Sequence, residues 1–134
     1  AIYQGLVRSC HDLSEGGLAV AIAEMAFAGG FGAKIDLKSL PSPIGRGTQR
    51  VPGGEGVSDS EKAVILLFSE SNTRFICEVT PENAEAFETA MSGIACAKIG
   101  EVVDGTNLEI TLDQPILKAD IAALKESWQK PLRW

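Results

Sequence analysis

The sequence predicts a single α+β domain in which helices pack against a mixed β-sheet. Segments with strand-like alternation and segments with a helix-like apolar face follow one another along the chain. An Asp104-Gly105 pair, typical of a hairpin turn, joins two strand-like segments and breaks a strictly parallel pattern. The 134 residues are the usual size of one domain and suffice to bury a hydrophobic core.

Composition and charge exclude several classes of function. The net charge is −6 and no basic run is present, which argues against binding to nucleic acid or to an anionic membrane. No segment has transmembrane length, and the first residues lack a signal-peptide pattern. Cys10, Cys77 and Cys96 are widely spaced, so we expect reduced thiols in a cytoplasmic protein rather than a zinc site or a disulfide framework.

The first third of the chain predicts a strand, a buried helix and a second strand. Residues 6–10 form a strand or an extended lead-in. Ser14 is a candidate N-cap for a helix that continues to about residue 28, is apolar almost all round and ends at two glycines. Residues 31–37 alternate like a strand. Because the chain begins without Met, in what resembles the end of a helix, we expect a fragment of a longer protein.

A flexible loop rich in glycine and proline, residues 38–59, separates this part from the rest of the domain. The segment 63–68 fits a buried strand or a short helix, and the Ser58 to Glu61 helix-start signal favours the helix. The remaining expected elements are a strand at 73–80, a helix at 81–91 capped by Thr80, a hairpin of strands at 95–103 and 108–112, and a final amphipathic helix at 116–128.

Polar chemistry is concentrated where the first helix begins. The only histidine, His11, precedes Asp12 and Ser14, and the pair Gly16-Gly17 then opens the helix. Backbone N–H groups at such a point favour a nearby anion by about 0.3–1 kcal/mol. Each residue also has a structural interpretation: a histidine bonded to backbone, a capping aspartate, and glycines that allow close packing. For His11 we favour ligand contact over general acid–base catalysis.

A second polar group comprises the turn Ser69-Glu70-Ser71 and Arg74. Arg74 could pair with a phosphate or carboxylate in a cleft, or the segment could be a solvated turn. The phosphate-loop, dinucleotide and zinc-protease motifs and a catalytic Cys–His spacing are absent from the sequence. We therefore expect neither a catalytic residue nor a metal ligand in this chain.

Three segments resemble a known family. The first is residues 11–19 (HDLSEGGLA), continuing to 23–26 (AEMA). The others are residues 67–71 (LFSES) followed by Arg74-Phe75, and residues 99–102 (IGEV). They are similar to the C-terminal domain of the synthetase subunit of phosphoribosylformylglycinamidine synthase. A shorter form of the first motif is shared by aminoimidazole-ribotide synthetase and hydrogenase-maturation relatives. The loop at 42–58 departs from the family pattern, and we assign it no function.

The resemblance implies an aminoimidazole-ribotide-synthetase-like α+β fold and a place in purine biosynthesis. The full ligase converts formylglycinamide ribonucleotide to formylglycinamidine ribonucleotide with ATP, Mg²⁺ and glutamine-derived ammonia. ATP and Mg²⁺ bind mainly in N-terminal domains outside this chain, so the fragment alone should be inactive. The implied partners are those N-terminal domains, a glutaminase subunit and a small bridging subunit.

In this family the C-terminal domain closes one wall of the ribonucleotide cleft. The expected substrate-binding residues are His11, Asp12, Ser14, Gly16, Gly17, Ser69 and Arg74. Two alternatives remain open: a non-catalytic structural or interaction module, and the homologous domain of a related ATP-dependent enzyme such as a hydrogenase-maturation protein.

Overall fold

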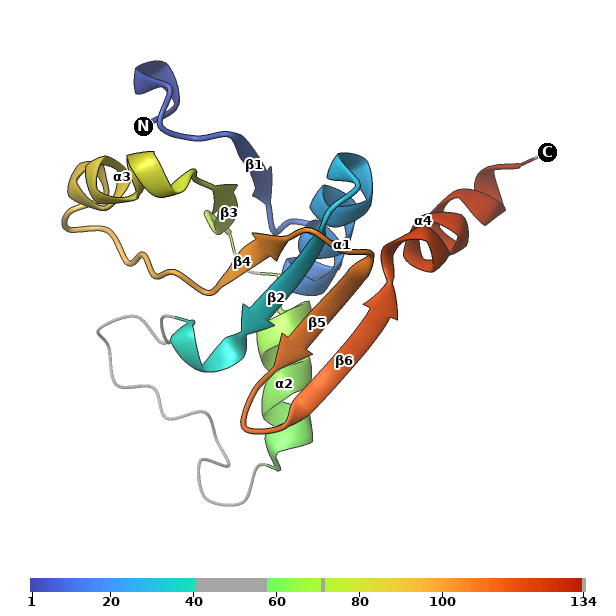
Figure 1. The fold of residues 1–134 in the computed structure, drawn as a ribbon. Coiled ribbons are helices and arrows are strands. Elements are labelled where there is room, and N and C mark those ends of the chain that lie inside the picture. Colours follow the sequence, from blue (N-terminus) through green and yellow to red (C-terminus); the bar gives the residue numbers. More distant parts are fainter. Residues whose placement is uncertain (41–57, 71, 134) are drawn as a thin grey trace.

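The computed structural model describes residues 1–40, 58–70 and 72–133. Its described part contains a four-stranded sheet, a separate two-stranded ribbon and four α-helices (Figure 1). Most of the loop expected at residues 38–59 lies outside the described residues. Within the described ranges no helix is both long and apolar enough to cross a bilayer.

The larger sheet has the strand order β4-β2-β5-β6 and is mixed, as predicted. Strand β2 (Gly32–Asp36) is central: it pairs antiparallel with β4 (Gly100–Val103) and parallel with β5 (Asn107–Thr111). Strand β6 (Pro115–Asp120) adds an antiparallel edge to β5.

The predicted hairpin across Asp104-Gly105 is wrong. The turn does join β4 to β5, but β2 lies between the two strands, so they do not pair with each other. The Gly32 N–H donates to the Gly105 carbonyl at 2.7 Å, which holds β2 against the turn. A Cβ on Gly32 would lie 2.6 Å from the Asn107 oxygen, so glycine permits this close approach.

The two-stranded ribbon pairs β1 (Ser9–Asp12) with β3 (Phe75–Glu78) in antiparallel register. Strand β1 therefore includes His11 and Asp12, whereas the sequence predicted that the extended segment would end at residue 10. Strand β3 lies within the strand expected at 73–80. Side chains alternate across the ribbon, so His11 and Cys10 lie on opposite faces.

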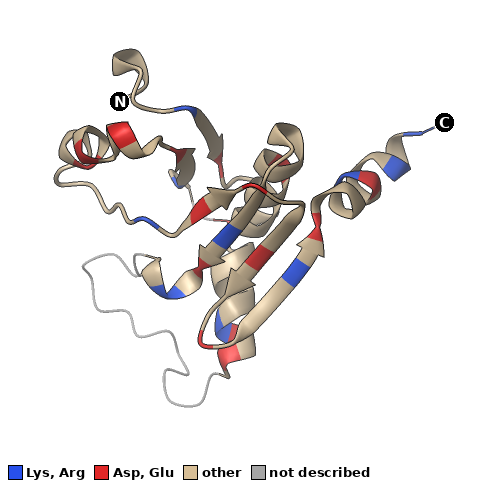
Figure 2. Cartoon of the chain, in the orientation of Figure 1, with Lys and Arg blue, Asp and Glu red and all other residues tan. Residues whose placement is uncertain are grey.

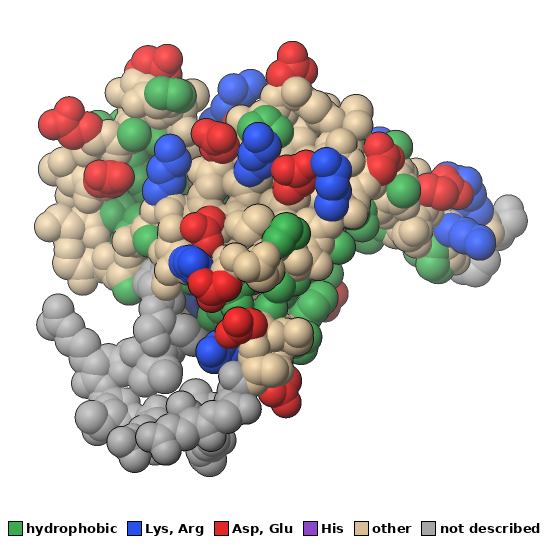
Figure 3. Space-filling view, turned by 60° about the horizontal axis from the view of Figure 1, so that its bottom comes forward, with side chains coloured by type: hydrophobic (Ala, Val, Ile, Leu, Met, Phe, Trp, Pro, Cys, Tyr) green, Lys and Arg blue, Asp and Glu red, His purple; other side chains and the backbone are tan. Residues whose placement is uncertain are grey.

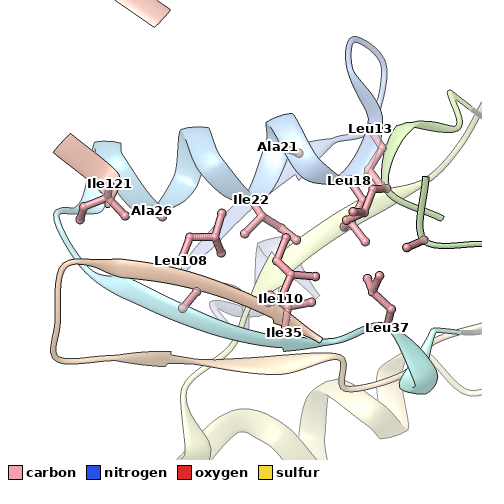
Figure 4. Packing of buried hydrophobic residues seen from close by; sticks show 13 residues of the cluster. Leu13, Leu18, Ala21, Ile22, Ala26, Ile35, Leu37, Leu108, Ile110 and Ile121 are labelled. Carbon is pink, nitrogen blue, oxygen red and sulfur yellow. The ribbon is translucent and has the colours of Figure 1, made fainter. Parts of the chain in front are cut away.

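Three helices enclose the core behind the sheet. Helix α1 (Gly17–Gly29) packs against α2 (Asp59–Phe68) and α4 (Ile121–Gln129), and its buried side chains meet those of β2 and β5 (Figure 4). The largest fully buried side chains are Leu18, Leu37, Leu108 and Ile110. As predicted, α1 has no fully exposed residue between Gly17 and Phe27, and Gly30 ends it in the left-handed conformation.

The choice of helix over strand for α2 is confirmed. Ser58 caps it through a reciprocal capping box, in which its hydroxyl accepts from the Glu61 N–H and the Glu61 carboxylate accepts from the Ser58 N–H. Its outer face leaves Val64, Ile65 and Phe68 exposed. Figure 3 shows hydrophobic side chains gathered on that side of the molecule.

The expected last helix at 116–128 is wrong in its first part. Residues 115–120 form β6, and α4 begins only at Ile121. The Asp120 carboxylate accepts from the N–H groups of Ala122 and Ala123, at 3.0 Å each, and so fixes the start of the helix. Asp120 is a local N-cap signal. Because apolar residues lie on both sides of it, the strand and the helix look like one continuous amphipathic segment in the sequence.

The other predicted elements are present but shorter. The helix expected at 81–91 is a 3₁₀ turn (Pro81–Asn83) followed by α3 (Ala84–Ala90), and Thr80 makes no side-chain cap bond. The strand expected at 95–103 is confined to β4. Among the described residues, acidic and basic side chains are scattered over all these elements rather than gathered in one run (Figure 2).

Candidate functional site

The predicted site residues gather where β1 leads into α1 and where the α2–β3 connection passes beside it. An open groove of about 790 Å³ is lined by His11, Asp12, Ser14 and Arg74, together with Glu70 and neighbouring residues. A smaller hollow of about 360 Å³ on the other side of His11 adds Gly16 and Glu24 to its lining. Ser69 and Gly17 line neither space. The fold thus brings the two predicted polar groups together.

His11 is held on both ring nitrogens by acceptors. Its Nε2 lies 2.8 Å from the Glu24 carboxylate of α1, and its Nδ1 lies 2.6 Å from the Asp12 carbonyl oxygen. Carboxylate and carbonyl oxygens only accept, so the doubly protonated ring is the form that satisfies both contacts at once. The Asp12 carbonyl and the Glu24 carboxylate raise the pKa of His11, against the opposing effect of burial.

Both N–H groups of His11 are thus engaged inside the domain. Bonded in this way, the ring ties the end of β1 to α1 and offers no free N–H to a ligand in this conformation. Direct ligand contact through an N–H, as expected from the sequence, would require one of these bonds to open. The geometry favours a positioning role for His11.

Asp12 and Ser14 face the groove. A hydrogen bond from the Ser14 side chain lowers the pKa of the Asp12 carboxyl, and the charge of His11 adds to this effect. Asp12 Oδ1 lies 3.6 Å from His11 Nδ1. The carboxylate is therefore ionised at neutral pH and able to accept hydrogen bonds from a ligand.

The N-cap of α1 is Gly16, which corrects the prediction of Ser14. Gly16 adopts a left-handed conformation with φ of 71° and makes no side-chain cap bond. Its N–H instead donates to Glu70 Oε1 at 2.8 Å. A carboxylate from the α2–β3 connection thus occupies the position at the helix start where the sequence suggested a ligand anion.

Gly17 supports the packing interpretation of the glycine pair. Its φ is 63°, and a Cβ there would lie 2.7 Å from the Leu67 carbonyl oxygen and 3.0 Å from the Phe68 Cα. The first turn of α1 therefore packs directly against the backbone at the end of α2. Only glycine combines this backbone conformation with this contact.

Arg74 turns back onto its own loop. Its Nη1 donates to the Ser69 Oγ at 3.0 Å and to the Ser69 carbonyl oxygen at 3.2 Å, and its carbonyl accepts from the Leu13 N–H. Beside it, Thr73 has a φ of 65°, which is uncommon for a β-branched residue and indicates a constrained turn. Ser69 thus supports Arg74 from behind the groove.

The expected binding residues left out two acids of the site, Glu24 and Glu70, although Glu70 belongs to the second polar group of the sequence. Glu24 is the only charged residue of α1, and an acid on an otherwise apolar helix signals a buried partner. Glu70 lies in the segment that resembles the family, but its bond to Gly16 spans 54 positions and no local pattern predicts it.

The groove presents mostly hydrogen-bond acceptors beside a single guanidinium. Asp12 and Glu70 contribute carboxylates, and Arg74 contributes the positive charge. This arrangement suits a ligand rich in hydroxyl or amine donors, with an anionic group near Arg74. Among residues 1–40, 58–70 and 72–133, no three Asp, Glu, His or Cys side chains converge as a metal site.

A mixed sheet backed by α1 and α2, with a polar β1–α1 junction, defines an α+β domain class. The chain belongs to the family described as AIR synthase related protein, C-terminal domain, whose profile matches residues 1–113.

Curated relatives carry the name phosphoribosylformylglycinamidine synthase subunit PurL, which confirms the resemblance. The protein of Lactobacillus helveticus is 40% identical over 132 residues, which are 98% of this chain and 15% of that protein. The protein of Alkaliphilus metalliredigens is 35% identical over 99% of this chain and 16% of its own length. The chain thus spans about a sixth of the curated relatives it matches.

Solved structures share the fold. PurL of Thermotoga maritima complexed with FGAR matches with a TM-score of 0.70 at 23% identity, over 92% of this chain and 19% of that chain. A HypE–HypF complex matches with a TM-score of 0.59 at 22% identity, over 87% of this chain and 36% of that chain. The α+β fold class predicted from the sequence is confirmed.

Proposed function

We propose that this chain is the C-terminal domain of a phosphoribosylformylglycinamidine synthase, the ligase that makes formylglycinamidine ribonucleotide in purine biosynthesis. The observation that carries the proposal is 40% identity to such a subunit over 98% of this chain. Solved PurL structures of the same fold were obtained with ATP and with FGAR. The reaction, its substrates and its partners belong to the whole protein, of which this chain is a small part.

Within that enzyme, we assign this domain one wall of the ribonucleotide cleft. Asp12 and Ser14 would accept hydrogen bonds from ribose hydroxyls, and Arg74 would face the phosphate or another anionic group. Gly16, Gly17 and Ser69 would shape the wall through the contacts described above. His11 would position Asp12 by tying β1 to Glu24 of α1.

ATP and Mg²⁺ are assigned mainly to the rest of the enzyme. In proteins Mg²⁺ is usually bound by one or two carboxylates together with substrate phosphates. Among the described residues, no three potential ligand side chains converge as a metal site. The domain would therefore orient the ribonucleotide and exclude water, while phosphorylation of the amide oxygen and attack by ammonia occur at groups outside it.

The proposed partners are the preceding domains of the same protein, a glutaminase subunit and a small bridging subunit. A solved PurLQS assembly of T. maritima has a subunit with this fold. We place the complex in the cytoplasm, where the substrates of purine biosynthesis and reduced thiols are found.

The test is mutation in the full-length protein, with kcat and KM measured for the ribonucleotide. Hydrogen bonds to charged groups contribute about 1.5–3 kcal/mol, so Asp12→Asn and Arg74→Ala should each lower kcat/KM by roughly 10- to 150-fold. Lys118→Ala on β6, outside the groove, is the control and should leave both constants unchanged. Wild-type constants in both groove variants would refute the site assignment.

The positioning role of His11 needs a separate test. His11→Ala should lower kcat/KM. Glu24→Gln should lower the pKa of His11, and the pH dependence of kcat/KM should shift in the same direction. A change in activity without any shift of the profile would assign His11 a purely structural role.

A structural module is the second candidate, and one observation favours it. Gly16 and Gly17 are fully engaged by Glu70 and by the end of α2, so the motif could serve packing alone. Titration of the protein with the ribonucleotide, followed by chemical shifts, separates the two functions. Shifts clustered at residues 11–18 support binding. A domain of a hydrogenase-maturation relative is a third candidate, and ribonucleotide turnover by the full-length protein would exclude it.

A further inference from the structure

Two of the three cysteines face each other across the two-stranded ribbon. Cys10 of β1 is paired in register with Cys77 of β3, and their Sγ atoms lie 3.5 Å apart. The Leu13 N–H donates to the Arg74 carbonyl, which places the odd-numbered residues of β1 at hydrogen-bonded positions. Cys10 and Cys77 therefore form a non-hydrogen-bonded pair, the kind in which opposing side chains approach most closely.

This geometry is close to that of a cross-strand disulfide. Cα atoms of a non-hydrogen-bonded pair are about 4.5 Å apart, within the usual range of about 4.4–6.8 Å for bridged cysteines. The sulfurs need to approach by about 1.5 Å to reach the bonded separation of about 2.05 Å, which rotation of the side chains can supply.

The two thiols differ in environment. Cys10 is exposed and lines the groove, whereas Cys77 is partly buried and its S–H donates to Cys10 Sγ. Burial, followed by the hydrogen bond to Cys10, raises the pKa of Cys77 to about 12. Cys10 is thus the sulfur that a reagent meets first. The role of Cys77 rests on position, because its sulfur lies 3.5 Å from Cys10 Sγ, whereas its raised pKa would slow its attack.

We propose that Cys10 and Cys77 form a reversible disulfide when the protein meets hydrogen peroxide. The Cys10 thiolate attacks one peroxide oxygen, the O–O bond breaks, and Cys10 becomes a sulfenic acid while hydroxide leaves. The Cys77 sulfur then attacks the Cys10 sulfur, the S–O bond breaks, and water leaves with the Cys77 proton. In total two thiols and one peroxide give one disulfide and two waters, and excess dithiol restores both thiols.

The experiment maps the bond in the full-length protein after brief peroxide treatment, acid quench and alkylation of free thiols. Trypsin alone leaves Cys77 and Cys96 in one peptide, residues 75–98, so digestion must add a protease that cuts after glutamate. The two enzymes together release residues 9–15 with Cys10, residues 75–78 with Cys77, and a separate peptide with Cys96.

The expected product is the 9–15 peptide linked to the 75–78 peptide, lost again on treatment with dithiothreitol. Cys96→Ser should keep this link, and Cys77→Ser should replace it with a sulfenic or more oxidised Cys10. Two results would overturn the proposal. One is a link from Cys77 to Cys96. The other is that Cys10 and Cys77 both remain free after peroxide has oxidised other thiols of the protein. The mapping of the peroxide-treated protein without substitutions is decisive even if a variant fails to fold.

Discussion

Replacement of Gly17 by alanine tests the packing of α1 on α2 most directly. Two separate costs should combine at this position. A left-handed backbone costs a residue with a Cβ about 1–2 kcal/mol. A methyl group 2.7 Å from the Leu67 carbonyl oxygen and 3.0 Å from Phe68 adds the cost of overpacking, about 1–3 kcal/mol. We expect Gly17→Ala to lower the free energy of unfolding by about 2–5 kcal/mol.

Two other glycines separate these costs. Gly30 has a φ of 75° and open space where a Cβ would lie, so Gly30→Ala should carry the backbone cost alone. Gly105 has open space and no positive φ, so Gly105→Ala should be neutral or slightly stabilising, by about 0.4–1 kcal/mol. The difference between Gly17→Ala and Gly30→Ala then measures the contact with α2.

Urea unfolding of the three variants provides the assay. With a denaturant slope of about 1–3 kcal/mol per molar urea, the loss in Gly17→Ala should lower the midpoint by roughly 0.7–5 M. Equal stabilities of Gly17→Ala and Gly30→Ala would refute the close approach of α1 to the end of α2. If Gly17→Ala instead kept full stability but bound the ribonucleotide weakly, the glycine would serve the ligand rather than the fold.

Three further predictions concern single contacts. The pKa of His11 is raised above its unfolded value of about 6.5, so its stabilising contribution should be complete below about pH 6.5 and lost as the pH rises through the folded-state pKa. Because the sequence has one histidine, a single imidazole NMR signal reports this pKa, and a midpoint at or below 6.5 would contradict the bonds to Glu24 and Asp12. Asp120→Ala should cost about 0.5–2 kcal/mol in urea unfolding, since Ala122 and Ala123 lose their cap, and an unchanged midpoint would remove the N-cap assignment. Ile110→Ala should cost about 2–5 kcal/mol, because the side chain is fully buried between the sheet and α1, and a loss below 1 kcal/mol would mean that the core is not packed as described.

Local signals in the sequence predicted the helices better than the sheet. The capping box at Ser58 and the glycines after α1 act within one turn, so they can be recognised without knowledge of the fold. The order of strands depends instead on contacts between distant segments. Asp104-Gly105 gave a correct turn but a wrong pairing, because nothing local indicates that β2 inserts between the strands it joins.

The sequence singled out most of the polar residues that line one groove, but not their contacts. The group around His11 and the group around Arg74 do share one groove. The carboxylates that engage His11 and Gly16 come from elsewhere in the fold, Glu24 from the next helix and Glu70 from the α2–β3 connection. Such partners depend on tertiary packing, which the motif alone does not specify.

The insertion of β2 between β4 and β5 sets an order of events during synthesis. Strand β2 leaves the ribosome before both of its neighbours, which begin only at Gly100 and Asn107. At about 5–20 residues per second, translation of the 37–99 segment takes roughly 3–13 s. Over that interval α1 can already pack on α2, while both edges of β2 lack a strand partner. The sheet is therefore completed last, and a nascent chain stalled before residue 100 would expose β2 to pairing with other chains.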